Sequence, residues 1–257
     1  MDNKFKHVIS LGCSCGVAMM LEQCGMRNIA YPFDWIISPW NGVEKSIENG
    51  FIDWFDIDLL YQSTDLAHAY KNRKYGIKFF HDFNGYDPLH KQTEQVEQKY
   101  ERRIKRFYQN IQEPCLFIRK IFWDECVEEL NYLYENYDSV LSRLKSYNEN
   151  NEICFIVQEK DFRDEFRSGN FGNRVFLLNE SDLDDCSKAV GLIGNKSIVE
   201  YLQESVDMDN YISNMSFLRK KNKKKNSFCN MIREKTSKIF RRKYIHSKQY
   251  KKDQYFV

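Results

Sequence analysis

Short apolar runs alternate with longer amphipathic segments over the first 180 residues. Residues 7–11 (HVISL) form an apolar, partly β-branched run that is typical of a strand. From Gly16 the apolar positions recur at helical spacing up to Gly25, which predicts a helix ending at a glycine. Nearly continuous apolar runs predict buried strands over residues 115–121 and 153–157. The remaining predictions are strands over 76–83 and 175–178, a helix over 43–55 that is interrupted at Gly50, helices over 92–111 and 126–147, a loop plus helix over 190–206, and an ordered loop over 30–40.

This alternation of strands and helices predicts an α/β fold, with a mostly parallel sheet flanked by helices on both faces. The pattern weakens near residue 215. We therefore expect two parts: an α/β domain over residues 1–215, and a basic C-terminal extension over residues 216–257 that is helical or disordered. No internal repeat is apparent in the sequence.

Composition narrows the class of protein. Of the 257 residues, 42% are hydrophobic, so the chain has enough apolar material for a core and is not a disordered protein. No apolar stretch approaches the ~18 residues of a membrane span, and the start of the chain does not resemble a secretory signal. Its eight cysteines are therefore expected to be free thiols, and the expected location is the cytoplasm.

Charge is unevenly distributed along the chain. The net charge is +2, but residues 219–257 hold 15 Lys and Arg against two acidic residues, so the preceding part is acidic. The basic extension could contact an anionic surface by charge alone, while no motif predicts specific nucleic-acid binding. The alternative is a solvated extension without a partner.

The sharpest local feature is a cysteine-rich turn between the first strand and the first helix. A thiol at a helix N-terminus is expected to have a lowered pKa, because backbone N–H groups and the helix dipole favour the thiolate. Cys15 lies nearer the helix start than Cys13, so we expect Cys15 to be the nucleophile. Gly12 would allow the sharp turn, and the N–H groups of Gly16 and Val17 would bind an oxyanion. The alternatives are a buried structural thiol and a metal site, but the C-x-C spacing lacks a second ligand pair, so no metal is predicted.

A cysteine nucleophile needs a general base and a group that orients the base. His81 is the candidate base, because it ends a predicted strand, where α/β sheets place their sites. Asp82 and Asp34 are both candidates for the orienting carboxylate. Asp34 is slightly favoured because its aromatic surroundings would exclude water and strengthen a hydrogen bond to an imidazole. The alternative for His81 is a histidine satisfied at a sheet edge.

Arg103 and Arg106 are spaced three residues apart on a predicted helix, so their side chains lie near each other. Together they could bind a carboxylate or a phosphate group of a substrate. The alternative is a solvated basic face, which is the common role of such a charge run.

Four sequence blocks occur in a fixed order along the chain. The blocks are LGxxCxxAxxL from Leu11, PFDW ending at Trp35, HDF from His81 and YxxRxxRF from Tyr100. Over residues 7–180 the chain thereby resembles a bacterial family described as papain-like cysteine peptidases. The resemblance places Cys15 at the family cysteine, His81 and Asp82 at its His–Asp pair, and Asp34 at its FDW acid; Trp35 falls in the same block and is a candidate substrate contact.

The resemblance implies a thiol enzyme that acts on a peptide or another acyl compound without a cofactor. A second hypothesis is a coenzyme-A-dependent acyltransferase of surface polysaccharide synthesis, because a strand-Gly-x-x-Cys-helix opening is also similar to such enzymes. Both reactions need a thiolate, a base and an oxyanion site, and they differ in the acceptor, which is water or a glycan hydroxyl. A third hypothesis is a non-catalytic anion-binding protein that uses the basic extension.

Overall fold

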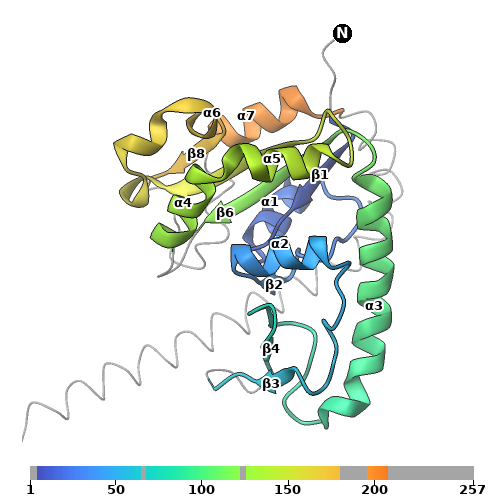
Figure 1. The fold of residues 1–257 in the computed structure, drawn as a ribbon. Coiled ribbons are helices and arrows are strands. Elements are labelled where there is room, and N and C mark those ends of the chain that lie inside the picture. Colours follow the sequence, from blue (N-terminus) through green and yellow to red (C-terminus); the bar gives the residue numbers. More distant parts are fainter. Residues whose placement is uncertain (1–4, 65–67, 122–125, 180–195, 208–257) are drawn as a thin grey trace, which may run out of the picture. The chain divides into compact units, whose positions relative to one another are not determined.

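The computed structural model describes residues 5–64, 68–121, 126–179 and 196–207, and its centre is a four-stranded parallel sheet (Figure 1). The strand order is β1-β6-β7-β8. In this register Val8 pairs with Leu116, and Phe117 pairs with Ile153. The predicted mostly parallel α/β fold is thus confirmed. The strands are β1 (His7–Ser10), β6 (Cys115–Ile121), β7 (Glu152–Gln158) and β8 (Val175–Leu178).

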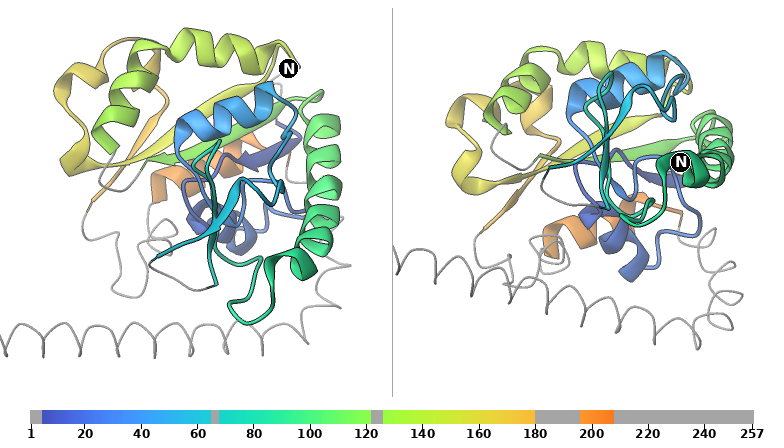
Figure 2. Two further views of the ribbon diagram at one scale, coloured as in Figure 1. Left: turned by 60° about the horizontal axis from the view of Figure 1, so that its bottom comes forward. Right: turned by 90° about the horizontal axis from the view of Figure 1, so that it is seen from below.

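Helices cover both faces of this sheet (Figure 2). Alternate residues of β6 point to opposite faces, so Leu116 and Ile118 pack in one core and Phe117 and Ile121 in the other. The continuous apolar pattern of β6 follows directly from burial on both faces. The first face is covered by α1 (Gly16–Gln23) and α7 (Lys196–Ser205), and the second by α2 (Trp40–Glu48), α4 (Cys126–Glu135) and α5 (Tyr137–Lys145).

A second, smaller sheet lies beyond the carboxyl ends of β1 and β6 (Figure 1). It is antiparallel, with the order β2-β5-β4-β3. The sequence predicted one strand over residues 76–83, but only two of those residues form a strand, and that strand belongs to this sheet. The strands are β2 (Ile36–Ile37), β3 (Leu60–Gln62), β4 (Tyr70–Asn72) and β5 (Lys78–Phe79).

One long helix, α3 (Leu89–Asn110), joins the two sheets. Its 22 residues span about 33 Å at 1.5 Å per residue. Tyr100 packs against Phe79 of the small sheet, whereas Phe107 packs against Phe117 of the parallel sheet. The apolar stripe predicted from the sequence therefore has two different partners along its length.

Two other predicted elements differ from the structure. The helix predicted over 126–147 is divided into α4 and α5, because the backbone of Asn136 leaves the helical region at φ −111° and ψ 13°. The helix predicted over 43–55 with an interruption at Gly50 ends at Glu48, Gly50 has φ +65°, and no helix resumes over residues 51–55. Short helical turns, η1 (Glu159–Asp161), η2 (Asp164–Arg167) and α6 (Gly169–Gly172), connect β7 to β8.

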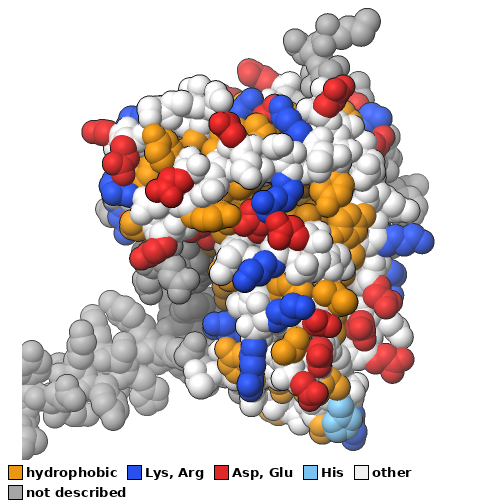
Figure 3. All heavy atoms as spheres, viewed as in Figure 1, with side chains coloured by type: hydrophobic (Ala, Val, Ile, Leu, Met, Phe, Trp, Pro, Cys, Tyr) orange, Lys and Arg blue, Asp and Glu red, His pale blue; other side chains and the backbone are white. Residues whose placement is uncertain are grey.

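The surface in Figure 3 shows acidic and basic side chains interspersed on one face. Arg143 forms ion pairs with Glu44 (2.7 Å) and with Glu48. Among the described helices, none is long and apolar enough to cross a membrane. The basic extension predicted over residues 216–257 lies outside the described residues.

Candidate active site

The turn between β1 and α1 has an unusual backbone. Gly12 and Cys13 both have positive φ, at +82° and +73°. A β-carbon on Gly12 would lie 2.3 Å from Ser38 Oγ, so the position needs glycine for space as well as for conformation. Cys13 holds its strained conformation with its N–H donated to Ser38 Oγ at 3.1 Å. Gly12, which was predicted to allow a sharp turn here, has the positive φ that this turn requires.

A buried arginine from β6 holds this turn in place. Arg119 is 1% exposed and forms two hydrogen bonds of 2.8 Å with the carboxylate of Glu129 from α4. Its other N–H groups donate to the Leu11 carbonyl (2.9 Å), the Ser38 carbonyl (2.8 Å) and Ser38 Oγ (3.2 Å). All five N–H groups of the guanidinium thus have acceptors. Because Ser38 also accepts from Cys13, Arg119 connects three segments around the cysteine turn.

Cys15 is the residue preceding the first turn of α1, and its carbonyl accepts the N–H of Met19 at 2.9 Å. The residue is partly exposed, whereas Cys13 is only 2% exposed. The predicted lowering of its pKa is wrong. Burial raises the pKa of the Cys15 thiol, and the backbone N–H and the positive charge of Lys120 lower it by less. The sequence revealed the helix N-terminus but not the burial of the sulfur.

The proposed oxyanion donors begin α1. Gly16 and Val17 are both buried, and the Gly16 N–H donates weakly to Ser14 Oγ at 3.4 Å. The first N–H groups of a helix have no carbonyl partner within that helix. Their role as oxyanion donors stays a prediction.

His81 follows β5 in an aromatic setting. The residue is exposed, but its ring contacts the rings of Phe80 and Trp35 edge to face, with centroids 4.8 and 5.9 Å away. Partial burial lowers the pKa of the imidazole, and the charge of Asp82 raises it by less. The side chain is therefore neutral at pH 7 and can accept a proton. No hydrogen bond between Cys15 and His81 is present among the described residues, so their pairing stays a prediction.

Asp82 is adjacent to His81 but has other partners. Its carboxylate forms an ion pair with Lys99 and accepts a hydrogen bond of 2.9 Å from the Tyr100 hydroxyl. The carboxylate is 3% exposed. These contacts fix Asp82 against α3, and its predicted role in orienting His81 is not tested by them.

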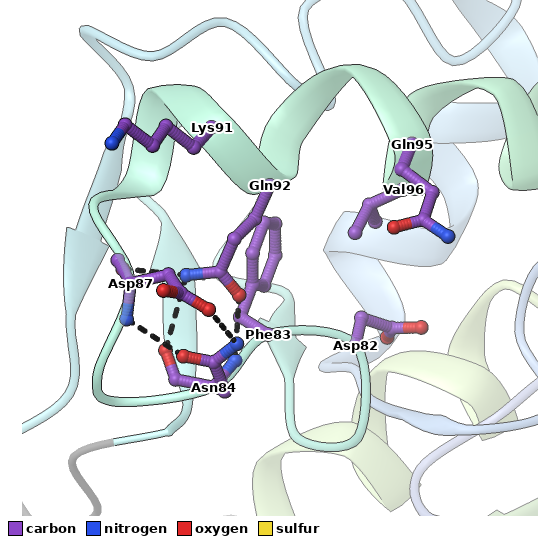
Figure 4. Close-up of a pocket in the computed structure, with 8 residues that line it drawn as sticks. All are labelled: Asp82, Phe83, Asn84, Asp87, Lys91, Gln92, Gln95 and Val96. Carbon is purple, nitrogen blue, oxygen red and sulfur yellow. Dashed lines mark hydrogen bonds between the residues drawn. The ribbon is translucent and has the colours of Figure 1, made fainter.

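An open polar pocket of about 400 Å³ lies beside Asp82 (Figure 4). Asn84, Asp87 and Gln92 form a hydrogen-bonded group on one side of it, and Asp82 stands apart from that group. The lining includes Asp82 but neither Cys15 nor His81, so this pocket does not contain the candidate nucleophile or the candidate base. The lining residues are Asp82, Phe83, Asn84, Asp87, Lys91, Gln92, Gln95 and Val96.

Asp34 lies in the loop between α1 and β2 and is 1% exposed. Its Oδ2 accepts two hydrogen bonds from Arg27, at 2.9 and 3.0 Å, and one from the Tyr31 N–H at 2.9 Å. Burial raises the pKa of Asp34 more than the charge of Arg27 lowers it. The Arg27 guanidinium also lies 5.5 Å from the Trp35 ring centre, which connects Asp34 to the surroundings of His81 indirectly.

Arg103 and Arg106 are half-buried on α3, so they do not belong to its solvated basic face. Arg106 donates to the Ala30 carbonyl at 3.0 Å, and Arg103 lies 4.9 Å from the centre of the Tyr100 ring. Arg102 and Lys105, by contrast, are exposed. The structure thus separates the two predicted arginines from the charge run around them.

Comparison with known proteins matches residues 6–161 to a family described as "Putative papain-like cysteine peptidase". The chain belongs to this family. The match includes the cysteine turn, Asp34, His81 and both arginines of α3.

A related sequence is the uncharacterized protein R408 of Acanthamoeba polyphaga mimivirus. It is 32% identical over 123 residues, which cover 39% of this chain and 54% of the viral protein. The chain therefore matches about half the length of this relative. No solved structure matches the chain.

The sequence did not reveal three charged residues that contact or influence the site of this papain-like family member: Arg27, Arg119 and Lys120. Arg119 and Lys120 are consecutive charged residues at the end of an apolar strand, and both are buried at 1% exposure. A charged pair within such a run indicates specific partners, because an unpaired buried charge is costly. Arg27 gave no comparable indication, since its neighbours are polar and nothing local reveals its contact with Asp34.

Proposed function

We propose that this papain-like family member is a cysteine-dependent acyl enzyme, a peptidase or another acyl hydrolase, with Cys15 as the nucleophile. The main support is the position of Cys15. The residue is partly exposed, directly precedes α1, and its thiol lies within the electrostatic influence of Lys120 at the carboxyl edge of the parallel sheet. Sites of open α/β sheets lie at this edge. Cys13, with its buried side chain, is a structural member of the turn.

The reaction has two steps. In the first, Cys15 Sγ forms a bond to the acyl carbonyl carbon, and the bond from that carbon to the leaving nitrogen or oxygen breaks. The thiol proton moves to the His81 imidazole and then to the leaving group. In the second, water attacks the thioester and gives a proton to His81, the C–S bond breaks, and the proton returns to the sulfur. The N–H groups of Gly16 and Val17 would stabilise the oxyanion in both steps.

This assignment requires His81 to reach the Cys15 thiol in the substrate complex. Catalytic hydrogen bonds are often absent or long in a free enzyme and form when substrate binds. The raised pKa of Cys15 also fits a general-base mechanism, in which the thiol is deprotonated as it attacks. Asp82 and Asp34 remain the two candidates for orienting His81.

The first test is covalent trapping of Cys15. The chain is mixed with p-nitrophenyl acetate, and the acyl adduct is located by mass spectrometry of peptides. We expect acylation at Cys15 that is lost in Cys15→Ser and slowed by about 10²-fold or more in His81→Ala. Cys24→Ser is a matched control, because Cys24 is also partly exposed, lies at the other end of α1 and has a pKa raised by burial. Acylation of Cys24 at an equal rate, or none at Cys15, would overturn the proposal.

The pH dependence of iodoacetamide labelling adds a second readout. Because burial raises the pKa of Cys15, its labelling should rise only above the ordinary thiol value of about 8.5. Lys120→Met should move this midpoint higher still, since the charge of Lys120 lowers the Cys15 pKa. Decay of the acyl adduct in water identifies a hydrolase, whereas decay only after addition of a sugar identifies an acyltransferase.

A further inference from the structure

Three arginines surround a single buried carboxylate between α3 and the loop that follows α1. Arg27 forms two hydrogen bonds with Asp34. The charges of Arg103 and Arg106 also act on Asp34, although neither forms a hydrogen bond with it. Arg27 also forms a longer ion pair, at 3.4 Å, with the exposed Glu22, so three positive charges face two negative charges at this place.

Two of these arginines have buried donors without acceptors. Nη1 of Arg103 and Nε of Arg106 are inaccessible to solvent and have no hydrogen-bond partner among the described residues. Nearly all buried polar groups in proteins are hydrogen-bonded, so an unsatisfied pair indicates a missing acceptor. Guanidinium donors bind carboxylate and phosphate oxygens best.

The neighbouring carboxylates are already engaged by other groups. Asp34 Oδ2 accepts three hydrogen bonds, two from Arg27 and one from Tyr31. Asp82 is paired with Lys99 and with the Tyr100 hydroxyl. The cluster therefore has an excess of positive charge, which an incoming anion would balance.

We propose that Arg103 and Arg106, supported by the Arg27–Asp34 pair, bind an oxyanion group of the substrate, either a carboxylate or a phosphate. As a substrate subsite, this inference rests on the proposed acyl chemistry. The link is Trp35, whose ring is 5.5 Å from the Arg27 guanidinium and 5.9 Å from the His81 ring. Through Trp35, the Arg27–Asp34 pair that supports the subsite adjoins the aromatic surroundings of the candidate base.

Direct binding tests the subsite without turnover. Isothermal titration calorimetry on the full-length Cys15→Ser chain, at constant ionic strength, would use inorganic phosphate, acetate and, as a reference, chloride. We expect saturable binding of phosphate or acetate, and the tighter of the two identifies the oxyanion class. Arg103→Gln and Arg106→Gln should each weaken that binding about tenfold or more, as expected for the loss of a charge-assisted contact.

Arg102→Gln is the matched control, because Arg102 is an exposed arginine on the same helix. An equal loss of binding in Arg102→Gln would mean that the anion responds only to the overall charge of α3, and the subsite would be rejected. Unchanged binding in Arg103→Gln would also reject it. Circular dichroism confirms folding, and Arg106→Lys, which keeps the charge, replaces Arg106→Gln if the latter fails to fold.

The two proposals fail in different ways. Anion binding that depends on Arg103 without any acylation of Cys15 would retain the subsite and reject the acyl enzyme. Acylation of Cys15 without anion binding would do the reverse. Where both hold, the wild-type chain should prefer succinyl over propionyl p-nitrophenyl esters by about tenfold in kcat/KM, and Arg103→Gln should remove the preference.

Discussion

Two arginine–carboxylate pairs in this molecule have opposite surroundings. Arg119 and Glu129 lie beside the cysteine turn, and every N–H of Arg119 has an acceptor. Arg27 and Asp34 lie beside α3, where two further arginines have buried donors without acceptors. The first pair completes its own network, whereas the second is surrounded by excess positive charge.

This difference separates a structural role from a binding role. Burial alone does not distinguish the pairs, because Arg119 and Asp34 are both 1% exposed. The distinguishing property is whether the neighbouring donors are satisfied within the protein. A complete network rigidifies the fold, while an incomplete one has a place for an acceptor from outside.

The largest effect is expected from Arg119→Met. The substitution leaves the Glu129 carboxylate without its charged partner, with only the Trp40 N–H still bound to it, and removes the bonds that connect Leu11 to Ser38. Breaking one side of a buried ion pair costs about 3–5 kcal/mol, so the free energy of unfolding should fall by that amount. Urea denaturation followed by circular dichroism measures it.

Arg27→Met is the companion variant in the other pair. Its side chain is 12% exposed, and the pKa of Asp34 is already raised, so the carboxylate can take up a proton when Arg27 is lost. We expect a smaller loss, about 1–3 kcal/mol at neutral pH, that shrinks as the pH falls and Asp34 becomes neutral. Equal losses in the two variants would contradict the distinction between the pairs.

A second prediction concerns the glycine in the cysteine turn. Gly12→Ala and Gly50→Ala both place a side chain at positive φ, which costs about 1–2 kcal/mol. Only Gly12 also has an obstacle, since its new β-carbon would lie 2.3 Å from Ser38 Oγ, while nothing lies within 4 Å at Gly50. Gly12→Ala should therefore destabilise the protein by about 1–3 kcal/mol more than Gly50→Ala, as overpacking does. Thermal unfolding compares the two variants. Equal decreases in Tm would show that the turn rearranges to accommodate the new methyl group.

The parallel sheet could be predicted from the sequence because each of its strands is a distinct apolar run. The strand over 115–121 matches its predicted bounds because burial on both faces leaves a continuous apolar run, and the partly buried strand over 175–178 also matches its predicted bounds. The small sheet could not be predicted. Its strands have two or three residues, too few for a period, and they are held by tertiary contacts such as those of the buried Asn72 side chain with the carbonyls of Asp53 and Trp54.

The candidate site likewise has features that the sequence indicates and features that it does not. Cys15 was visible because glycines mark the turn and the helix begins directly after it. The direction of its pKa shift was not, because desolvation depends on which segments cover the sulfur. Arg119 was concealed within an apolar run, and Arg27 among polar neighbours, so their partners became apparent only in three dimensions.

The smallest expected effect concerns His81, which lies near the Arg27–Asp34 pair through their common neighbour Trp35. Burial against its neighbours lowers the pKa of the imidazole, and Trp35 is one of those neighbours. Trp35→Ala should readmit water and raise the His81 pKa toward its ordinary value of about 6.5, as measured by NMR titration of the ring protons. Tyr86→Ala is the control, because Tyr86 is 97% exposed in the same loop and should leave the His81 pKa unchanged.

If His81 is the general base, the acid limb of the pH–rate profile must move upward with its pKa in Trp35→Ala, since the base is active only when deprotonated. A limb that stays fixed while the His81 pKa moves would assign the proton transfer to another group.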